Sequence, residues 1–260
     1  MSDSLGDRMK GYENVFRQYL PKRMPVICRL DGRSFHNYTK GCARPIDENL
    51  VSCMNETAIY LCHNIQGTKI AYVQSDEISL LITNDETNET QPFVGNCLPK
   101  IVSLSAGMAS AYFTSISDRI FGKQKLAVFD SRAFVLPINE VNNYMIWRQN
   151  DATRNSVSSL AQSLYSHKAL HGKRNAELQE LIWQKGINWD KLPTTQKRGR
   201  CIVKVQVEKP AVNRKTGEVI TAIRSEWIVD NEVPIFSKNK DYVNRYLEIK
   251  NYDDDIDLDS

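Results

Sequence analysis

The chain has 260 residues, 41% of them hydrophobic, which is enough to bury a sizeable core in one large domain or in a domain with an appendage. Its 34 lysines and arginines nearly balance its 31 aspartates and glutamates, so the net charge of +3 alone does not identify a partner. Five of the residues from 253 to 259 are aspartates. Without those five charges the body carries about +8, which suits a phosphate-rich partner and an ordinary solvated surface equally well.

The sequence lacks the features of secreted and membrane proteins. Its first residues contain no apolar segment, so no signal peptide is expected. No apolar run approaches the roughly 20 residues that cross a bilayer. The six cysteines show neither C-x-x-C spacing nor a nearby histidine pair, which disfavours a zinc site and a disulfide framework. We therefore expect a cytoplasmic protein with reduced thiols and no membrane partner.

The first predicted elements are a helix, a strand and a second helix. Residues 5–20 carry apolar side chains on one stripe, which predicts an amphipathic helix that ends before Pro21. Residues 25–31 form a short apolar run that ends in Asp31 and precedes a glycine, which predicts a buried strand with a turn at its end. Residues 47–65 have apolar residues at helical spacing, with Asp47 as the predicted N-cap.

A hairpin, a long helix and a strand are predicted next. Residues 70–82 contain two apolar runs separated by the tetrad Gln-Ser-Asp-Glu, which predicts a hairpin with acids at its tip. Residues 98–121 form a predicted helix, and one of its faces is rich in small residues, so we expect that face to pack closely on a sheet. Those small residues are Ser103, Ala106, Gly107 and Ser110. Residues 126–136 read as the next strand.

The remaining pattern completes an α+β fold. Residues 137–170 are mostly helical in pattern, and strands over 201–207 and 219–229 form a late hairpin that turns near 213–217. The element order β-α-β-β-α-β predicts a ferredoxin-like antiparallel sheet flanked by helices, which is also the plan of a polymerase palm. We expect residues 1–136 to form the palm-like core. Residues 137–260 form a helical and β-hairpin extension packed on the same core, giving a single compact unit.

Acidic residues mark two places in this predicted sheet. Asp31 ends the first strand, whereas Asp76 and Glu77 lie at the hairpin turn. The first strand of a βαββ sheet lies beside the hairpin, so the three acids can meet at one edge. Burying them together without a cation is costly, and Mg²⁺ prefers oxygen ligands and binds substrate phosphates. Two such ions would bind the attacking and the leaving oxygen of an in-line displacement.

The pattern also admits a plainer interpretation. A lone Asp-Gly pair is usually a turn, and an acidic hairpin tip is usually solvated. Gly32 would then serve only the turn, rather than bringing its backbone carbonyl close to a metal. The sequence pattern by itself leaves both interpretations open.

Four segments resemble motifs of the tRNA-histidine guanylyltransferases. Residues 29–36 are similar to the family's R-L-D-G-R-x-F-H, and residues 71–79 to its A-Y-x-Q-S-D-E-x-S. Residues 144–149 resemble its Y-x-x-W-R-Q, and residues 129–132 its F-D-[GS]-R. The likeness covers about residues 5 to 175 and is looser beyond them.

The resemblance implies a palm that builds RNA in the 3′-to-5′ direction. Asp31 and Asp76 would be the catalytic ligands of two Mg²⁺ ions, helped by the Gly32 carbonyl, and Glu77 would support the site. ATP or GTP would activate a 5′-monophosphate, and the 3′-hydroxyl of an incoming nucleotide would attack the activated phosphorus. The implied nucleotide-binding positions are Arg29, Gly32, Arg33, Ser34, Phe35, His36, Arg44, Ser75 and Asp76. Relatives are typically homotetramers, which we adopt by resemblance only.

Basic residues supply the predicted contacts to tRNA. Lysine and arginine neutralise backbone phosphates without reading sequence, although each basic cluster by itself also suits a solvated face. The predicted RNA-binding residues are Arg132, Arg148, Arg154, Asn155, Lys173, Arg198 and Arg200. Taken alone, a histidine such as His36 is more often structural than a phosphate contact.

One departure from the family pattern changes the predicted activity. After W-R-Q the tRNA-histidine enzymes continue with H-I-N-N-L-Y-N, whereas this chain reads Asn-Asp-Ala-Thr-Arg-Asn-Ser-Val from residue 150, keeping only Asn155. This is similar to the guanylyltransferase-like branch, which is associated with template-directed repair of 5′-truncated tRNA. We expect that activity. Strict addition of one guanosine to tRNA-His, a palm-fold nucleotide cyclase and a non-catalytic tRNA-binding module are the alternatives.

Overall fold

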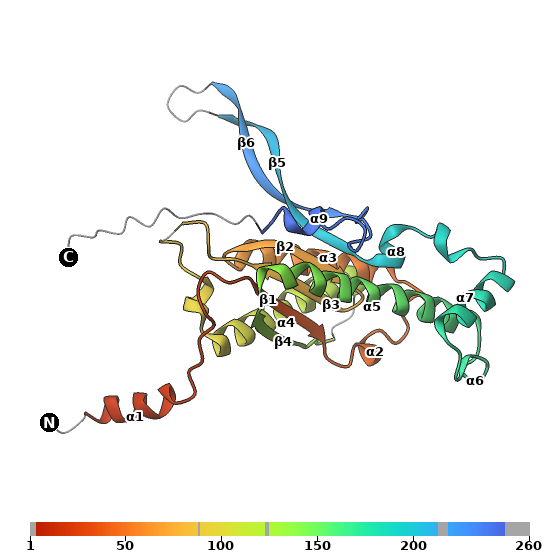
Figure 1. Cartoon of the computed structure of the whole chain (residues 1–260), viewed down its shortest axis with the longest axis horizontal. Coiled ribbons are helices and arrows are strands. Elements are labelled where there is room, and N and C mark those ends of the chain that lie inside the picture. The colour runs from red at the N-terminus through yellow and green to blue at the C-terminus, as the bar shows by residue number, and fades with distance from the viewer. Residues whose placement is uncertain (1–3, 88, 123–124, 213–217, 248–260) are drawn as a thin grey trace.

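A six-stranded antiparallel sheet forms the centre of the molecule, with the strand order β4-β1-β3-β2-β5-β6 (Figure 1). The structure is a computed structural model that describes residues 4–87, 89–122, 125–212 and 218–247. The strands are β1 (Val26–Gly32), β2 (Thr68–Gln74), β3 (Glu77–Ile82), β4 (Phe129–Val135), β5 (Arg200–Val212) and β6 (Val219–Asp230). The first four strands have the order of a ferredoxin-like sheet, which confirms the predicted α+β palm-like fold.

Helices cover both faces of this sheet. The longer ones are α1 (Leu5–Asn14), α3 (Glu48–Asn64), α4 (Leu98–Phe121), α5 (Ile138–Leu164) and α7 (Asn175–Gln184). The short ones are α2 (Phe35–Tyr38), η1 (Phe93–Asn96), α6 (His167–Leu170), η2 (Trp189–Lys191), α8 (Thr194–Arg198) and α9 (Asp241–Asn244). Apolar side chains of α3 and α4 share one core cluster with the sheet, whereas those of α5 and α9 share a second cluster on its other face. Among the described helices, none is both long and apolar enough to cross a membrane.

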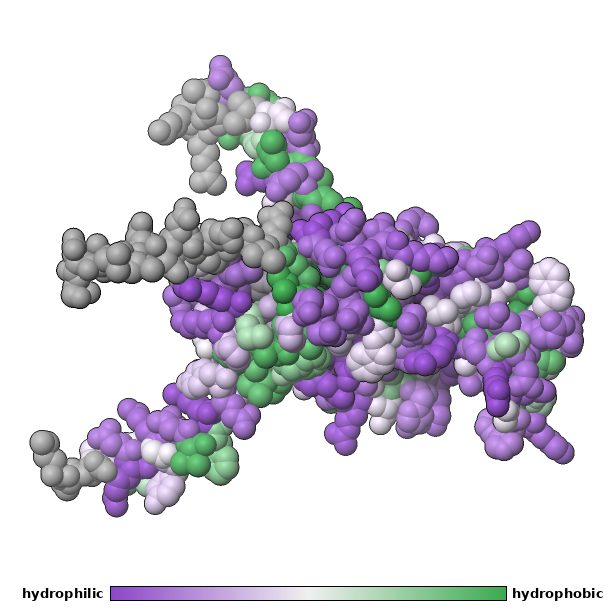
Figure 2. Space-filling view, in the orientation of Figure 1, coloured by the Kyte–Doolittle hydropathy of each residue, from purple (hydrophilic) through white to green (hydrophobic). Residues whose placement is uncertain are grey.

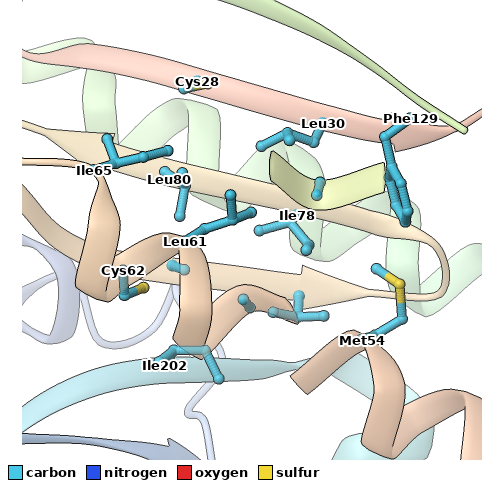
Figure 3. Close-up of a cluster of buried hydrophobic side chains, with 14 of the residues drawn as sticks. Cys28, Leu30, Met54, Leu61, Cys62, Ile65, Ile78, Leu80, Phe129 and Ile202 are labelled. Atoms are coloured by element: carbon cyan, nitrogen blue, oxygen red, sulfur yellow. The ribbon is translucent and has the colours of Figure 1, made fainter. Parts of the chain in front are cut away.

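The sheet is buried on both faces because its central strands are apolar on both sides. All six residues of β3 are buried: Ile78, Leu80 and Ile82 belong to the first cluster, and Leu81 belongs to the second. Figure 3 shows the first cluster, in which Leu61 of α3 lies against Leu80 and Ile78 of β3. Fully burying such a side chain stabilises the fold by about 1.5–3 kcal/mol. These strands therefore hold the hairpin between β2 and β3 on a rigid base.

Two predicted helix boundaries are confirmed, and a third is wrong. Asp47 caps α3 by accepting hydrogen bonds from the backbone N–H groups of Asn49 and Leu50. The predicted helix over 98–121 matches α4. The first helix, however, ends at Asn14 and not at residue 20. The chain after it extends instead and pairs with the segment around Cys97, where the Leu20 N–H donates to the Asn96 carbonyl at 2.9 Å.

The packing predicted for α1 and α4 needs correction. The apolar stripe of α1 buries nothing, and Figure 2 shows its green side chains standing apart from the body. On α4 the predicted small-residue face does not lie on the sheet throughout. Gly107 faces open space and Ser103 is exposed, whereas Ser110 accepts a hydrogen bond from the Phe129 N–H of β4. The buried face of α4 is instead the one that carries Ile101, Ser105, Ala109, Phe113, Ile116 and Ser117.

The C-terminal part of the chain extends the same sheet. Strand β5 pairs with β2, and β5 pairs with β6 over its whole length except the first residue. The β5–β6 hairpin then extends beyond the rest of the molecule (Figure 1). Its predicted turn at 213–217 and the acidic segment at 253–259 lie outside the described residues. The domain boundary after residue 136 stays a prediction.

Candidate active site

The acids predicted to meet do lie side by side at the edge of the sheet. Asp31 of β1 is the register partner of Glu77 in β3, and the Gly32 N–H donates to the Asp76 carbonyl at 3.1 Å. This hydrogen bond fixes the end of β1 against the tip of the β2–β3 hairpin. On the other side of β1, Asp130 of β4 is the register partner of Asp31. Register partners share a face of the sheet, so three carboxylates face the same side.

The carboxyl groups at this edge disfavour one another's ionised forms. Burial raises the pKa of Asp31, and the charges of Asp76, Glu77 and Asp130 raise it further. Burial also raises the pKa of Asp76, which a hydrogen bond with the Ser75 side chain partly offsets. A bound cation would relieve both effects, because it favours the charged form of each carboxylate.

The donor set suits a hard divalent cation, although it is smaller than the sequence suggested. Asp31, Asp76 and the Gly32 carbonyl supply only oxygen atoms, as Mg²⁺ requires. Among the described residues, no three His, Cys, Asp or Glu side chains form a group that could hold a metal ion. Glu77 does not join the pair, because its carboxylate is engaged with Arg148. The residues that fit a metal are therefore the Asp31–Asp76 pair with a backbone oxygen.

Gly32, Ser34 and Ser75 each occupy a place where the packing or the backbone conformation is unusual. A Cβ at Gly32 would lie 2.3 Å from the ring of Phe35, which is buried against Phe113 and Phe129. Glycine is thus needed here for packing and not for a positive φ. Ser34 and Ser75 both adopt the left-handed conformation, with φ of 56° and 46°. Such conformations cost about 1–3 kcal/mol and cluster at functional sites.

A cavity of about 850 Å³ opens at the hairpin tip between α3, α5 and the start of β5. Nine of the residues predicted to bind metal, nucleotide or RNA line it: Gly32, Ser34, Phe35, His36, Arg44, Ser75, Asp76, Asn155 and Arg200. Arg29 and Arg33 do not line it, and neither do Asp31 and Glu77. The cavity volume is in the range of small-molecule sites. The hairpin tip therefore presents Asp76 to a chamber that a nucleotide can enter, while Asp31 approaches from the adjacent strand.

A buried ion pair holds Glu77 in place. Arg148 of α5 donates from Nε to Glu77 Oε1 at 2.8 Å and from Nη2 to Oε2 at 2.6 Å. Both residues are buried. Arg148 also contacts Asp151 at 2.9 Å. Burial alone would lower the pKa of Arg148, but the hydrogen bonds and charge of Glu77 raise it overall. The bidentate geometry fixes the orientation of α5 relative to the hairpin.

The segment that resembles Y-x-x-W-R-Q makes other contacts of this kind. Tyr144 Oη lies 2.7 Å from Ser79 Oγ of β3. Gln149 donates to the Pro234 carbonyl and accepts from the Phe236 N–H, both at 2.8 Å. Trp147 is half exposed and contacts the guanidinium groups of Arg29 and Arg148. The motif thus joins α5 to the β2–β3 hairpin on one side and to the segment around Pro234 and Phe236 on the other.

The predicted RNA-binding residues separate into exposed and buried groups. The side chains of Arg132, Arg154, Asn155 and Lys173 are exposed, and Arg198 is partly exposed. Arg148 and Arg200 are buried, and their guanidinium groups bond to protein oxygens. The buried bidentate pair with Glu77 does not suit contact between Arg148 and an RNA backbone, whereas Arg200 lines the cavity described above.

Sequence reasoning missed Asp130 and Asn55 as residues of the site. Asp130 faces Asp31 only because β1 and β4 pair in a particular register, which the sequence does not reveal. The motif around Asp130 drew attention to Arg132, which pairs with that same carboxylate at 3.1 Å. Asn55 and Lys197 line the cavity from α3 and α8. Nothing in the local sequence distinguishes Asn55 from an ordinary surface residue, whereas Lys197 belongs to a basic cluster over residues 197–200 that the sequence offers as an RNA contact.

The palm-like sheet, the acidic hairpin tip and the adjoining cavity define a nucleotidyltransferase. A profile of the tRNA-His guanylyltransferase family matches residues 6–137, which is half of the chain. The chain belongs to that family. Its tRNA-processing relatives include the probable tRNA(His) guanylyltransferase of Dictyostelium discoideum, which is 26% identical over 252 residues and covers 89% of this chain and 93% of the relative.

Two solved structures have a higher sequence identity to this chain. A bacterial tRNA(His) guanylyltransferase-like protein in complex with ATP is 47% identical, with a TM-score of 0.85, and covers 95% of this chain and 100% of that chain. A complex of such a protein with GTP is 46% identical, with a TM-score of 0.80 and the same coverage. The tRNA(His) guanylyltransferase of Saccharomyces cerevisiae shares the fold, with 23% identity, a TM-score of 0.63 and coverage of 82% and 96%.

Proposed function

We propose that this protein adds nucleotides to the 5′ end of tRNA in the 3′-to-5′ direction, guided by the opposite strand of the acceptor stem. The observation that carries the proposal is the meeting of Asp31, Gly32 and Asp76 beside a nucleotide-sized cavity. The 47% identity to a bacterial protein in complex with ATP supports the choice of nucleotide. ATP and GTP are accordingly the proposed activating nucleotides.

The proposed reaction has two steps. In the first, a phosphate oxygen of the RNA 5′-monophosphate attacks the α-phosphorus of ATP and releases pyrophosphate. In the second, the 3′-hydroxyl of the incoming nucleoside triphosphate attacks the activated 5′ phosphorus and releases AMP. Positioning and charge stabilisation supply most of the catalysis in such transfers.

This chain's residues would divide the work between positioning and charge. Asp31, Asp76 and the Gly32 carbonyl would hold two Mg²⁺ ions, which would supply charge stabilisation at the attacking and leaving oxygens. Glu77 would keep the hairpin oriented through Arg148. Ser34, His36, Arg44 and Ser75 line the cavity, where they would contact the nucleotide.

Two observations favour repair of truncated tRNA over strict guanosine addition to tRNA-His. The chain lacks the H-I-N-N-L-Y-N continuation after residues 147–149. It is also 47% identical to a guanylyltransferase-like protein but 26% identical to relatives named tRNA(His) guanylyltransferase. Strict addition of one guanosine is therefore the second candidate.

The partners and the setting complete the proposal. We propose that the exposed residues Arg132, Arg154, Asn155 and Lys173, together with Arg198, contact tRNA phosphates. A homotetrameric assembly and a cytoplasmic location are proposed from the family resemblance.

The decisive assay uses 5′-monophosphorylated tRNA that lacks its first nucleotide. With ATP, the four nucleoside triphosphates and Mg²⁺, we expect extension by the nucleotide that pairs with the template base. Changing that template base should change the added nucleotide. Absence of any extension would refute the proposed activity. Addition of guanosine to tRNA-His alone would favour strict guanylyltransfer, and a cyclic product from nucleoside triphosphate without RNA would indicate a cyclase.

A further inference from the structure

Arg200 is a buried cation that forms no ion pair with a carboxylate of the described residues. Its side chain is 3% exposed at the start of β5. Its Nε donates to Asn55 Oδ1, and its Nη2 donates to the Val51 carbonyl at 3.5 Å. No aspartate or glutamate of the described residues lies within ion-pair distance of it. Its bonds in the protein are therefore to neutral oxygen atoms.

An isolated charge in this position is energetically expensive. Burial lowers the pKa of Arg200 to about 10, although Tyr72 and Glu48 act in the opposite direction. The guanidinium still carries its proton at neutral pH, because that pKa lies well above 7. Buried charges are normally paired with an opposite charge. An anionic ligand would provide the missing charge here.

The position of Arg200 identifies the space in which that anion would sit. Arg200 lines the cavity at the hairpin tip, as do Lys197 and Arg44. Lys197 is also buried: its Nζ donates to the backbone carbonyl of Asp190 and lies 3.8 Å from the exposed carboxylate of the same residue. Arg44 is exposed, and no ion pair involves it among the described residues. Three cations of the chain thus line the cavity.

The sheet register relates this wall to the acids. Arg200 is the register partner of Val73 in β2, and Asp76 follows three residues after Val73. The chain turns between these residues at Ser75, and both Asp76 and Arg200 line the cavity. A polyphosphate that began at Asp76 could therefore extend toward Arg200. Three other acids line the cavity: Asp47 caps α3, Glu232 accepts a hydrogen bond from Thr194, and the charge of Glu48 acts on Arg200.

We propose that Arg200, assisted by Lys197, binds the polyphosphate of the nucleoside triphosphate at the end of the cavity away from Asp76. This inference rests on the proposed function and names the residue that anchors its substrate. Guanidinium groups bind phosphate oxygens in a bidentate manner, which a lysine ammonium does not reproduce. The anchor would fix the direction in which the triphosphate enters, so that its α-phosphorus lies toward the acids.

The test measures binding of inorganic tripolyphosphate and of ATP by titration calorimetry. Arg200→Met is expected to weaken both roughly ten- to hundredfold, the loss expected for a charge-assisted hydrogen bond. Adenosine, which has no phosphate, should bind the variant and the native protein equally. Lys191→Met is the matched control, because it removes the same charge from an exposed position outside the cavity. Its affinities should stay unchanged.

Several results would overturn the inference. Unchanged tripolyphosphate affinity in a folded Arg200→Met variant would make Arg200 a structural brace between α3 and β5. A selective loss of affinity for a short 5′-monophosphorylated RNA would assign the site to RNA phosphate instead. Where Arg200→Met does not fold, Arg200→Lys decides, with about a tenfold loss expected and an unchanged affinity contradicting the proposal. Extension of truncated tRNA by the native protein, measured in parallel, tests the proposed function separately.

Discussion

Two buried arginines lie on opposite sides of the β2–β3 hairpin and differ in the charge of the groups that they contact. Arg148 contacts two carboxylates and makes a bidentate pair with Glu77 on the α5 side. Within the described part of the chain, Arg200 hydrogen-bonds only to neutral oxygens, and it lines the cavity on the α3 side. The pKa of Arg148 is raised overall by Glu77, whereas burial lowers the pKa of Arg200 to about 10.

The difference separates a structural charge from one that is available to a ligand. The Arg148 pair is satisfied within the protein, so its role is to position the hairpin that carries Asp76. Arg200 leaves its charge uncompensated beside an open chamber, which suits binding of an anion. A buried charge that is paired within the protein therefore suits a positioning role, whereas one that lacks an opposite charge suits binding of a charged substrate.

The largest expected effect comes from the acid between these two arginines. Asp76→Ala should lower nucleotide addition by at least roughly a thousandfold, because the reaction loses a ligand for its stabilising charge. The measurement is single-turnover extension of truncated tRNA. The affinity for tRNA, measured in parallel, should remain unchanged. Retention of most of the activity would remove Asp76 from the mechanism.

Breaking the ion pair between Arg148 and Glu77 should strongly destabilise the protein. Arg148→Met leaves Glu77 as an unpaired buried carboxylate, so the free energy of unfolding should fall by about 3–5 kcal/mol in urea titrations. The double variant with Glu77→Gln should recover part of that loss, since no charge is then left buried. A loss below about 1 kcal/mol for Arg148→Met would show that water reaches Glu77 and that the pair does not hold the hairpin.

A substitution in the backbone next to Arg200 should have a smaller effect on stability. Gly199 has φ 74° and ψ −159°, and a Cβ there would lie 2.6 Å from the Val73 carbonyl oxygen. Gly199→Ala should therefore lower the free energy of unfolding by about 1–3 kcal/mol and shift Arg200 away from the cavity. Gly107→Ala is the control: its helical position faces open space, and alanine there should stabilise by about 0.5–1 kcal/mol. Equal effects of the two substitutions would refute the steric argument.

Removing the unpaired cation should change stability least. Arg200→Met loses hydrogen bonds to Asn55 and Val51, but it also removes the cost of an isolated buried charge. Asn55 is partly exposed, so water can replace its lost donor. We expect the free energy of unfolding to change by less than about 1 kcal/mol in urea titrations. A loss as large as that of Arg148→Met would mean that the two arginines play the same structural role.

The sequence predicts the fold well wherever local patterns decide the outcome. The apolar runs and turns predict β1, the β2–β3 hairpin and α4, and the capping role of Asp47 follows from its position before an apolar helix. The convergence of Asp31 and Asp76 also follows from strand order. It could be anticipated because adjacent antiparallel strands bring their ends together.

The remaining features depend on tertiary contacts that a sequence does not specify. The end of α1 at Asn14 depends on pairing of the following chain with a segment near residue 97. The partner of Glu77 is Arg148, 71 residues away, and the burial of Arg200 depends on α3 packing over the start of β5. A pattern of basic residues therefore predicted surface contacts for two arginines that lie inside the protein.

The most direct test of the account is an anomalous difference map of crystals grown with Mn²⁺ and a non-hydrolysable ATP analogue. We expect metal peaks beside the carboxylates of Asp31 and Asp76, with the triphosphate extending from them toward Arg200. Metal bound away from this pair, or a triphosphate directed away from the cavity, would contradict it.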